Sequence, residues 1–258
     1  MENRRYPVLE RGVRRAGLEE TCALAVMAKA PRAGMVKTRL QPPLGADEAA
    51  RLNVCFLRDT VENIALVASE GAARGLICYT PIGDEAAFDG LLPEGFALIA
   101  QRGDLFGERL LGAAKDILSC GFGAVCLIDS DSPTLPTNAL RAAVRELAAP
   151  DERVVVGASE DGGYYLIGMK RAEPRVFERI KWSTGTVYEE TVERAREAGV
   201  ELVELPKWYD VDDAATLSML ERELLNGERP PFGTTKGFDA KWTREFLVER
   251  VRLVGGVL

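Results

Sequence analysis

The strongest constraint on the fold is a regular alternation of strand-like and helix-like segments along the chain. Short apolar or β-branched runs alternate with longer stretches in which apolar residues recur at helical spacing. Because parallel strands need crossover connections, this order predicts an α/β fold with a mostly parallel sheet and helices on both faces. The predicted strands are residues 22–28, 74–80, 96–101, 124–128 and 153–159, followed by a strand that carries Tyr164 and Tyr165 and by 201–206. The predicted helices are 46–69, 84–92, 105–119 and 137–147, and a further helix that ends near residue 198.

Length and charge limit the classes of protein to consider. A chain of 258 residues with 47% hydrophobic residues can bury one sizeable core, which favours a single domain. The formal net charge of −7 argues against nucleic acid as a general partner. Because no apolar span reaches about 18 residues, we expect no membrane-spanning segment.

The cysteines and the chain termini favour a cytoplasmic protein. Five cysteines show no CxxC spacing and mostly lie in apolar runs, which predicts reduced core residues. Residues 1–20 lack an apolar core of signal-peptide length and are interpreted as a charged extension of a domain over residues 21–222. Residues 223–258 are interpreted as a tail with one amphipathic helix, which would pack on the body or on a partner subunit in a homodimer.

The absence of histidine restricts the possible chemistry. It excludes Ser-His-Asp and Cys-His nucleophile pairs, HExxH zinc sites and every imidazole general base. Any catalysis must therefore use carboxylates, lysine, hydroxyl groups or a metal held by oxygen. Such a metal would be a hard cation, Mg²⁺ or Mn²⁺.

A basic loop follows the first predicted strand. Ligands in open α/β sheets bind beyond the carboxyl ends of the strands, where backbone N–H groups and cations can face an anion. This loop therefore predicts a di- or triphosphate site, and a solvated surface loop is the alternative. Its candidate residues are Lys29, Arg32, Gly34, Lys37 and Arg39.

Paired aspartates follow two predicted strands. Asp129 and Asp131 lie one residue apart, and carboxylates at i and i+2 of an extended segment project to one side. They could share a divalent cation there, although an Asx turn before the next helix is an alternative. Asp210 and Asp212 repeat the spacing later in the chain. Helix capping is the default role for one acid of this second motif, which leaves the other for a site.

A glycine pair lies beside a candidate proton acceptor in the sequence SEDGGYYLIGM. Gly162 and Gly163 permit a close backbone approach to a ligand. Asp161 could bind a metal or accept a proton from an acceptor hydroxyl. Asp-Gly is also a strong hairpin signal, and the two interpretations are compatible.

A hydroxyl-rich stretch precedes a further predicted helix near residue 187. Ser183 and Thr184 could hold an anionic group or a sugar hydroxyl at the start of this helix, with Trp182 as a flat wall. A plain helix start accounts for the same residues equally well.

The order of these motifs is more specific than any one of them. KAPRAGMVKTR, Gln101-x-Gly103, IDSDSPTL, EDGGYYLIG, WSTGTV and DVDDAATL follow one another in the chain. Over roughly residues 20–220, the sequence resembles the nucleotide-diphospho-sugar transferase superfamily, which has the Rossmann-like GT-A fold. Within it, the chain is similar to a bacterial glycosyltransferase-like family with members linked to arsenosugar biosynthesis. More distantly, it resembles 2-phospho-lactate guanylyltransferase and the molybdenum-cofactor guanylyltransferase.

The resemblance implies a role for each motif. The basic loop would bind the phosphates of a nucleotide, and Gln101 with Gly103 would read its base. Asp129 would bind Mg²⁺ or Mn²⁺, with the other paired aspartates as partners. Asp161 and Lys37 would be catalytic, and the glycines with residues 182–184 would face the acceptor.

Three functions remain open at this point. The first is glycosyl transfer from an NDP-sugar to a small-molecule acceptor. The second joins an NTP to a phosphorylated small molecule and releases pyrophosphate, a chemistry that a loop rich in lysine and arginine favours. The third is nucleotide binding without catalysis.

Overall fold

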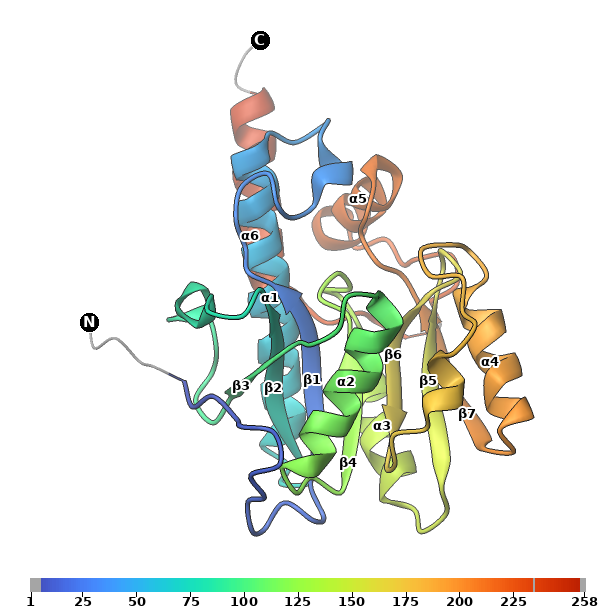
Figure 1. Ribbon diagram of the computed structural model, residues 1–258. Coiled ribbons are helices and arrows are strands. Elements are labelled where there is room, and N and C mark those ends of the chain that lie inside the picture. Colours follow the sequence, from blue (N-terminus) through green and yellow to red (C-terminus); the bar gives the residue numbers. More distant parts are fainter. Residues whose placement is uncertain (1–5, 234, 256–258) are drawn as a thin grey trace.

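A seven-stranded sheet forms the centre of the molecule, which is described over residues 6–233 and 235–255 by a computed structural model (Figure 1). The strand order is β3-β2-β1-β4-β6-β5-β7, and only β6 runs antiparallel to its neighbours. This arrangement confirms the predicted mostly parallel sheet. The strands are β1 (Cys22–Lys29), β2 (Ala73–Thr80), β3 (Ala97–Ala100), β4 (Ala124–Ile128), β5 (Arg153–Ser159), β6 (Tyr164–Met169) and β7 (Glu201–Trp208).

Helices cover both faces of the sheet, as predicted. Successive residues of β1 point to opposite faces, so Leu24 and Val26 pack toward α1 and α3, whereas Ala23 and Ala25 pack toward α2. Both faces are therefore apolar, as a parallel sheet requires. The helices are α1 (Ala46–Ala68), α2 (Phe106–Ser119), α3 (Thr137–Ala148), α4 (Val187–Glu197), α5 (Ala214–Glu221) and α6 (Lys241–Gly255).

One predicted helix is much shorter than expected. The stretch 84–92 forms only a 3₁₀ turn over Glu85–Phe88. Gly83 and Gly90, with φ angles of 94° and 72°, turn the backbone on either side of it. Because a left-handed residue ends regular helix, the two glycines confine any helical structure to the few residues between them.

A hairpin joins β5 to β6 and brings functional segments to one edge of the sheet. The Asp-Gly turn predicted at residues 160–163 is confirmed, because β6 returns antiparallel to β5. Strand β6 then lies between β4 and β5, and the backbone N–H of Asp129 donates to Tyr165 O at 2.9 Å. The carboxyl ends of β1, β4 and β5 and the beginning of β6 therefore meet at the same edge.

The described part of the N-terminal extension packs beside β3, the outermost strand at one side of the sheet. Leu9 N donates to Leu98 O at 2.7 Å, and Leu98 N donates to Pro7 O at 2.9 Å. Leu9 and Leu18 are buried among core residues. This segment covers the outer edge of β3, which would otherwise expose unpaired backbone groups. Residues 1–5 lie outside the described part of the chain.

The tail helix packs on the body. Helix α6 lies alongside α1, and the two extend beyond the sheet together (Figure 1). Buried Asp59 of α1 accepts hydrogen bonds from Trp242 N (3.0 Å), Thr243 N (2.8 Å) and Thr243 Oγ1 (2.6 Å) at the start of α6. Within the described residues, no helix combines the length and apolarity needed to cross a membrane.

Candidate functional site

A pocket of about 510 Å³ opens at the edge where β4 and β5 end and β6 begins. Its walls come from the ends of these strands, the first turn of α2, the segment before α4 and the segment after β7. Parallel sheets bind ligands at this edge, beyond the carboxyl ends of their strands. The polar side chains that line it include Arg39, Asp129, Asp131, Ser159, Asp161, Ser183, Thr184, Asp210 and Asp212.

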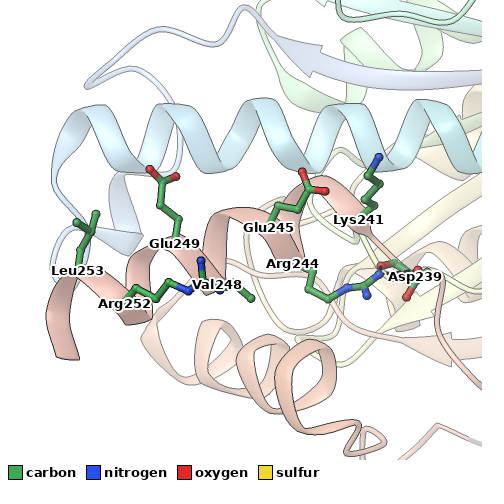
Figure 2. A pocket seen from close by; sticks show the side chains of 8 residues that line it. All are labelled: Asp239, Lys241, Arg244, Glu245, Val248, Glu249, Arg252 and Leu253. Atoms are coloured by element: carbon green, nitrogen blue, oxygen red, sulfur yellow. Dashed lines mark hydrogen bonds and ion pairs between the residues drawn. The ribbon is translucent and has the colours of Figure 1, made fainter. Parts of the chain in front are cut away.

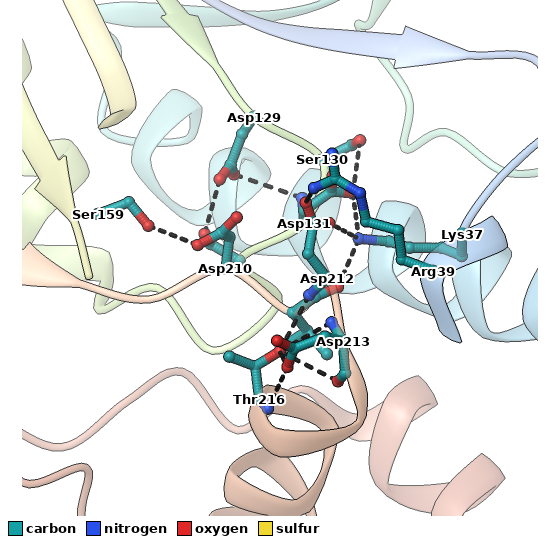
Figure 3. A network of polar contacts seen from close by, with 12 residues as sticks. Lys37, Arg39, Asp129, Ser130, Asp131, Ser159, Asp210, Asp212, Asp213 and Thr216 are labelled. Atoms are coloured by element: carbon teal, nitrogen blue, oxygen red, sulfur yellow. Dashed lines mark hydrogen bonds and ion pairs between the residues drawn. The ribbon is translucent and has the colours of Figure 1, made fainter. Parts of the chain in front are cut away.

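The four aspartates predicted to hold a metal all line this pocket and lie close together (Figure 3). We refer to Asp129, Asp131, Asp210 and Asp212 as the aspartate cluster. The first pair follows β4 and the second follows β7, and Val211 N donates to Asp131 O at 2.9 Å. This backbone bond joins two motifs that are far apart in the sequence.

Lys37 lies beside the cluster and connects its two halves (Figure 3). Its Nζ is 2.9 Å from Asp131 Oδ1 and 3.1 Å from Asp212 Oδ1, and it donates to Val211 O at 2.7 Å. The side chain is only 4% exposed. Burial alone would lower the pKa of Lys37, but the two carboxylates outweigh it and raise this pKa. Lys37 therefore stays charged and partly neutralises the cluster.

The other two aspartates are poorly compensated. The pKa of Asp129 is raised well above its ordinary value by burial and by the neighbouring charges of Asp131 and Asp210. Ser132 Oγ donates to Asp129 Oδ2 at 2.8 Å. Burial also raises the pKa of Asp210 to about 6, although Ser159 Oγ donates to it at 2.6 Å. The site thus holds more negative charge than its donors balance.

This donor set fits a hard divalent cation. All of the cluster's side-chain ligands are carboxylate oxygens, which suit Mg²⁺ or Mn²⁺. In the described part of the chain, however, no three acidic or cysteine side chains lie close enough to form a metal site by themselves. A bound ion would therefore take further oxygens from a ligand or from water.

The basic loop divides into two parts. Arg39 lines the pocket, and its Nη1 lies 3.5 Å from Asp212 Oδ2. Lys37 does not line the pocket, but its Nζ contacts Asp131 and Asp212, which do. Arg32 instead forms an ion pair with Asp84 at 2.6 Å and is 61% exposed. Lys29 ends β1 with an exposed side chain, and Gly34, at φ 73°, turns the loop. Two of the four cations thus reach the aspartates.

Gln101 and Gly103 do not line the pocket. The amide Nε2 of Gln101 donates to Cys78 O at 2.6 Å, inside the sheet. Gly103 has φ 111°, and a Cβ atom there would meet Glu108 Cβ at 2.8 Å. The glycine is thus needed for contact with α2. Base reading by these two residues stays a prediction.

Most of the predicted acceptor residues also line the pocket: Asp161, Gly163, Trp182, Ser183 and Thr184 do, and Gly162 does not. Asp161 lies near the aspartate cluster, since its charge helps to raise the pKa of Asp210. Asp161 Oδ1 accepts a hydrogen bond from Gly163 N at 2.8 Å within the hairpin turn. Gly162 packs against the backbone of Gly185, where a Cβ atom would collide with the carbonyl group. The hairpin and the segment before α4 are therefore held together, and this contact brings Trp182, Ser183 and Thr184 to the pocket.

Three residues in this region were not predicted from the sequence. Phe106 stacks edge-to-face on Trp182, with ring centroids 5.3 Å apart and an interplanar angle of 79°. Gly107 makes this contact possible, because a Cβ atom there would lie 2.6 Å from Trp182 Nε1. Tyr164 also lines the pocket, next to Gly163. In the sequence, the feature that could have pointed to this contact is Gly107, a glycine in the first turn of a predicted helix, where a close approach by another side chain is possible.

A second pocket of about 730 Å³ lies along α6 and contains none of the predicted site residues (Figure 2). Its charged side chains are of both signs and are partly paired. Arg244 contacts Asp239 at 2.5 Å, and Glu249 contacts Arg51 of α1 at 2.8 Å. Nothing in this balanced surface favours a particular ligand, so the pocket at the aspartate cluster is the better candidate.

Comparison with known proteins identifies related chains. Residues 63–184 match the family described as "Uncharacterized protein conserved in bacteria (DUF2064)". The structure is similar to a "putative nucleotide-diphospho-sugar transferase" from Desulfovibrio desulfuricans G20, with 31% identity, a TM-score of 0.75, and 91% of this chain and 97% of the other covered. A search of curated proteins finds no match.

A more distant solved structure shares the fold alone. It is 4-diphosphocytidyl-2C-methyl-D-erythritol synthase from Anaerococcus prevotii DSM 20548, with 8% identity and a TM-score of 0.50. The similarity covers 80% of this chain and 99% of the other. At this identity the comparison supports the architecture of the sheet and its helices.

Proposed function

We propose, because this chain belongs to the nucleotide-diphospho-sugar transferase superfamily, that it transfers a glycosyl group from an NDP-sugar to a small-molecule acceptor. The observation that carries this proposal is the pocket itself. It combines an under-compensated aspartate cluster and Arg39 with Asp161 and the aromatic rings of Phe106, Tyr164 and Trp182. The cluster and Arg39 thus suit a cation-bound diphosphate, and Asp161 with the rings suits an acceptor.

On the donor side, the protein's own groups would bind and orient the diphosphate. Asp129 and Asp131 would hold Mg²⁺ or Mn²⁺, which would neutralise charge on the leaving diphosphate. Arg39 is 71% exposed and can turn from Asp212 toward a phosphate oxygen. Lys37 would keep the cluster in place and add positive charge beside it.

On the acceptor side, Asp161 would act as the proton acceptor. The acceptor hydroxyl oxygen would attack the anomeric carbon of the donor sugar and form the new glycosidic bond. The bond between that carbon and the phosphate oxygen would break, and its electron pair would leave with the nucleoside diphosphate. Asp161 would take the hydroxyl proton, a role that its position on the pocket wall allows.

The geometry favours glycosyl over nucleotidyl transfer through the basic loop. A triphosphate donor was inferred from four cations, but Arg32 pairs with Asp84 away from the pocket, and Lys29 does not line it. Arg39 is left to contact the phosphates, and Lys37 adds positive charge from its buried position beside Asp131 and Asp212. This supply of positive charge is better matched to a diphosphate held with one divalent ion.

Product analysis tests the proposal. The purified protein is incubated with Mg²⁺ or Mn²⁺, a panel of NDP-sugars or NTPs, and sugar, polyol and phosphorylated acceptors. We expect nucleoside diphosphate as product, and we expect an Asp129→Asn variant to lose the metal-dependent reaction while remaining folded. Pyrophosphate release that requires a phosphorylated acceptor would establish nucleotidyl transfer instead. Nucleotide binding without either product would indicate a protein that binds without catalysis.

A further inference from the structure

Charge is distributed very unevenly in the pocket. Among the described side chains that line it, five are carboxylates and Arg39 is the single cation. Arg39 lies beside Asp212, in the part of the pocket assigned to the donor. The wall formed by Phe106, Tyr164 and Trp182 therefore offers no cationic partner to a ligand.

The nearest basic residues along the chain do not change this balance. Lys181 precedes Trp182, but its Nζ lies 3.8 Å from Glu190 and its side chain is 80% exposed. Lys207 Nζ pairs with Glu160 at 2.7 Å. Neither lysine lines the pocket. In the proposed function, Arg39 and the divalent ion serve the donor diphosphate. A phosphate on the acceptor would then lie close to Asp161 with no further cation among the described lining residues, which is electrostatically costly.

The aromatic wall is held in place before a ligand arrives. Trp182 is held on one side by the edge-to-face contact with Phe106 and by close packing against the backbone of Gly107, which has no side chain to interfere. On the other side, Thr184 Oγ1 donates to Lys181 O at 2.7 Å, so the segment closes on itself. A rigid aromatic surface loses little entropy when a flat ring stacks on it.

We infer that this wall selects an acceptor that is uncharged and presents a flat apolar ring face, with a hydroxyl group directed toward Asp161. A sugar ring and a hydroxyl-bearing aromatic ring share this chemistry. The inference rests on the proposed function for the role of the hydroxyl, but ring binding and the rejection of phosphate can be measured separately. Phe106 and Trp182 are then the residues that determine specificity for the acceptor.

Saturation-transfer NMR with phenyl β-D-glucopyranoside as the probe tests ring binding. We expect the wild-type protein to bind the probe, and Trp182→Ala to weaken binding about tenfold, which corresponds to about 1.4 kcal/mol, because the ring loses its stacking partner. Trp182→Phe should retain most of the affinity. Leu105→Ala removes a neighbouring side chain that is 65% exposed and outside the pocket, so it serves as the matched control.

Charge selection is tested by comparing glucose with glucose 6-phosphate as competitors of the same probe. We expect the phosphorylated sugar to compete no better than glucose. Methyl β-D-glucopyranoside and benzyl alcohol then separate a sugar from an aromatic ligand. Stronger competition by glucose 6-phosphate, or unchanged probe binding in Trp182→Ala, would overturn the inference.

A parallel nucleotide titration separates this inference from the proposed function. NDP-sugars and NTPs are titrated with Mg²⁺ by calorimetry into the same wild-type and Trp182→Ala proteins. Ring binding without any nucleotide binding would refute the transferase proposal and leave the aromatic wall intact. Nucleotide binding combined with a preference for the phosphorylated competitor would refute the aromatic wall alone.

Discussion

Two acidic regions of this molecule, one buried in the core and one lining the pocket, are built on opposite principles. Asp59, between α1 and α6, is 0% exposed and accepts three hydrogen bonds from the start of α6. The aspartate cluster gathers four carboxylates, two of them paired with Lys37, and burial together with acidic neighbours raises the pKa of its member Asp129. In the first region the fold supplies the donors that a carboxylate needs. In the aspartate cluster the fold supplies fewer donors than the carboxylates need, and a bound ligand or cation would supply the rest.

This difference separates stability from function within one protein. Burial raises the pKa of Asp59 to about 6, and the hydrogen bonds from Thr243 and Trp242 oppose that rise. Acidic neighbours oppose ionisation further at Asp129 and Asp210. Charged groups that are held together without compensation cost stability and are typical of binding sites. Variants of the two regions should therefore have opposite consequences.

The largest expected effect is on stability at Asp59. Asp59→Ala leaves two backbone N–H groups and a hydroxyl at the start of α6 without their acceptor. We expect the free energy of unfolding to fall by about 4 kcal/mol in urea denaturation, with nucleotide affinity unchanged for the folded protein.

Arg51→Ala is the control for this variant, because Arg51 and Glu249 join the same two helices through an exposed ion pair at 2.8 Å. We expect its loss to be under about 1 kcal/mol. Equal losses for the two variants would show that Asp59 is no more than an ordinary contact.

The next effect is on ligand binding through the basic loop. Lys37→Ala removes the cation that connects Asp131 to Asp212, and we expect nucleotide binding with Mg²⁺ to weaken by roughly 1.5 to 3 kcal/mol in calorimetry. Arg32→Ala is the matched control, because Arg32 pairs with Asp84 and does not line the pocket. An equal loss for Arg32→Ala would place the phosphates along the whole loop.

The smallest expected effect is a pH dependence of stability at Asp210. Its pKa in the folded state is about 6, against an ordinary value of 3.8. A raised carboxyl pKa contributes stability that is complete below the unfolded value and is lost as the pH rises through the folded value. Wild type should therefore lose about 1 kcal/mol more than Asp210→Asn between pH 4 and pH 7, after allowance for solvent in the pocket.

Urea denaturation at several pH values measures this difference. Subtraction of the variant's curve from that of wild type removes the contribution of Asp59, which also has a pKa of about 6. Parallel curves for the two proteins would show that Asp210 has an ordinary pKa in the folded protein.

Local sequence patterns were sufficient for the sheet and for most of its helices. Periodicity distinguishes strands from helices, and the Asp-Gly turn predicted the hairpin between β5 and β6 correctly. The helix predicted at 84–92 was too long, since only a 3₁₀ turn forms there, because the apolar pattern took no account of the turns at Gly83 and Gly90. Turn glycines override a short apolar pattern.

The sequence by itself also determined the chemistry available to the site. The lack of histidine and the paired aspartates restrict it to carboxylates, lysine and hard cations, whatever the tertiary structure. Only the tertiary structure decided which groups meet. It placed Arg32 on Asp84, Lys37 beside the aspartate cluster and Phe106 against Trp182. Residues so far apart in the chain meet through the order of the strands and the packing of loops at one edge, which local spacing does not encode.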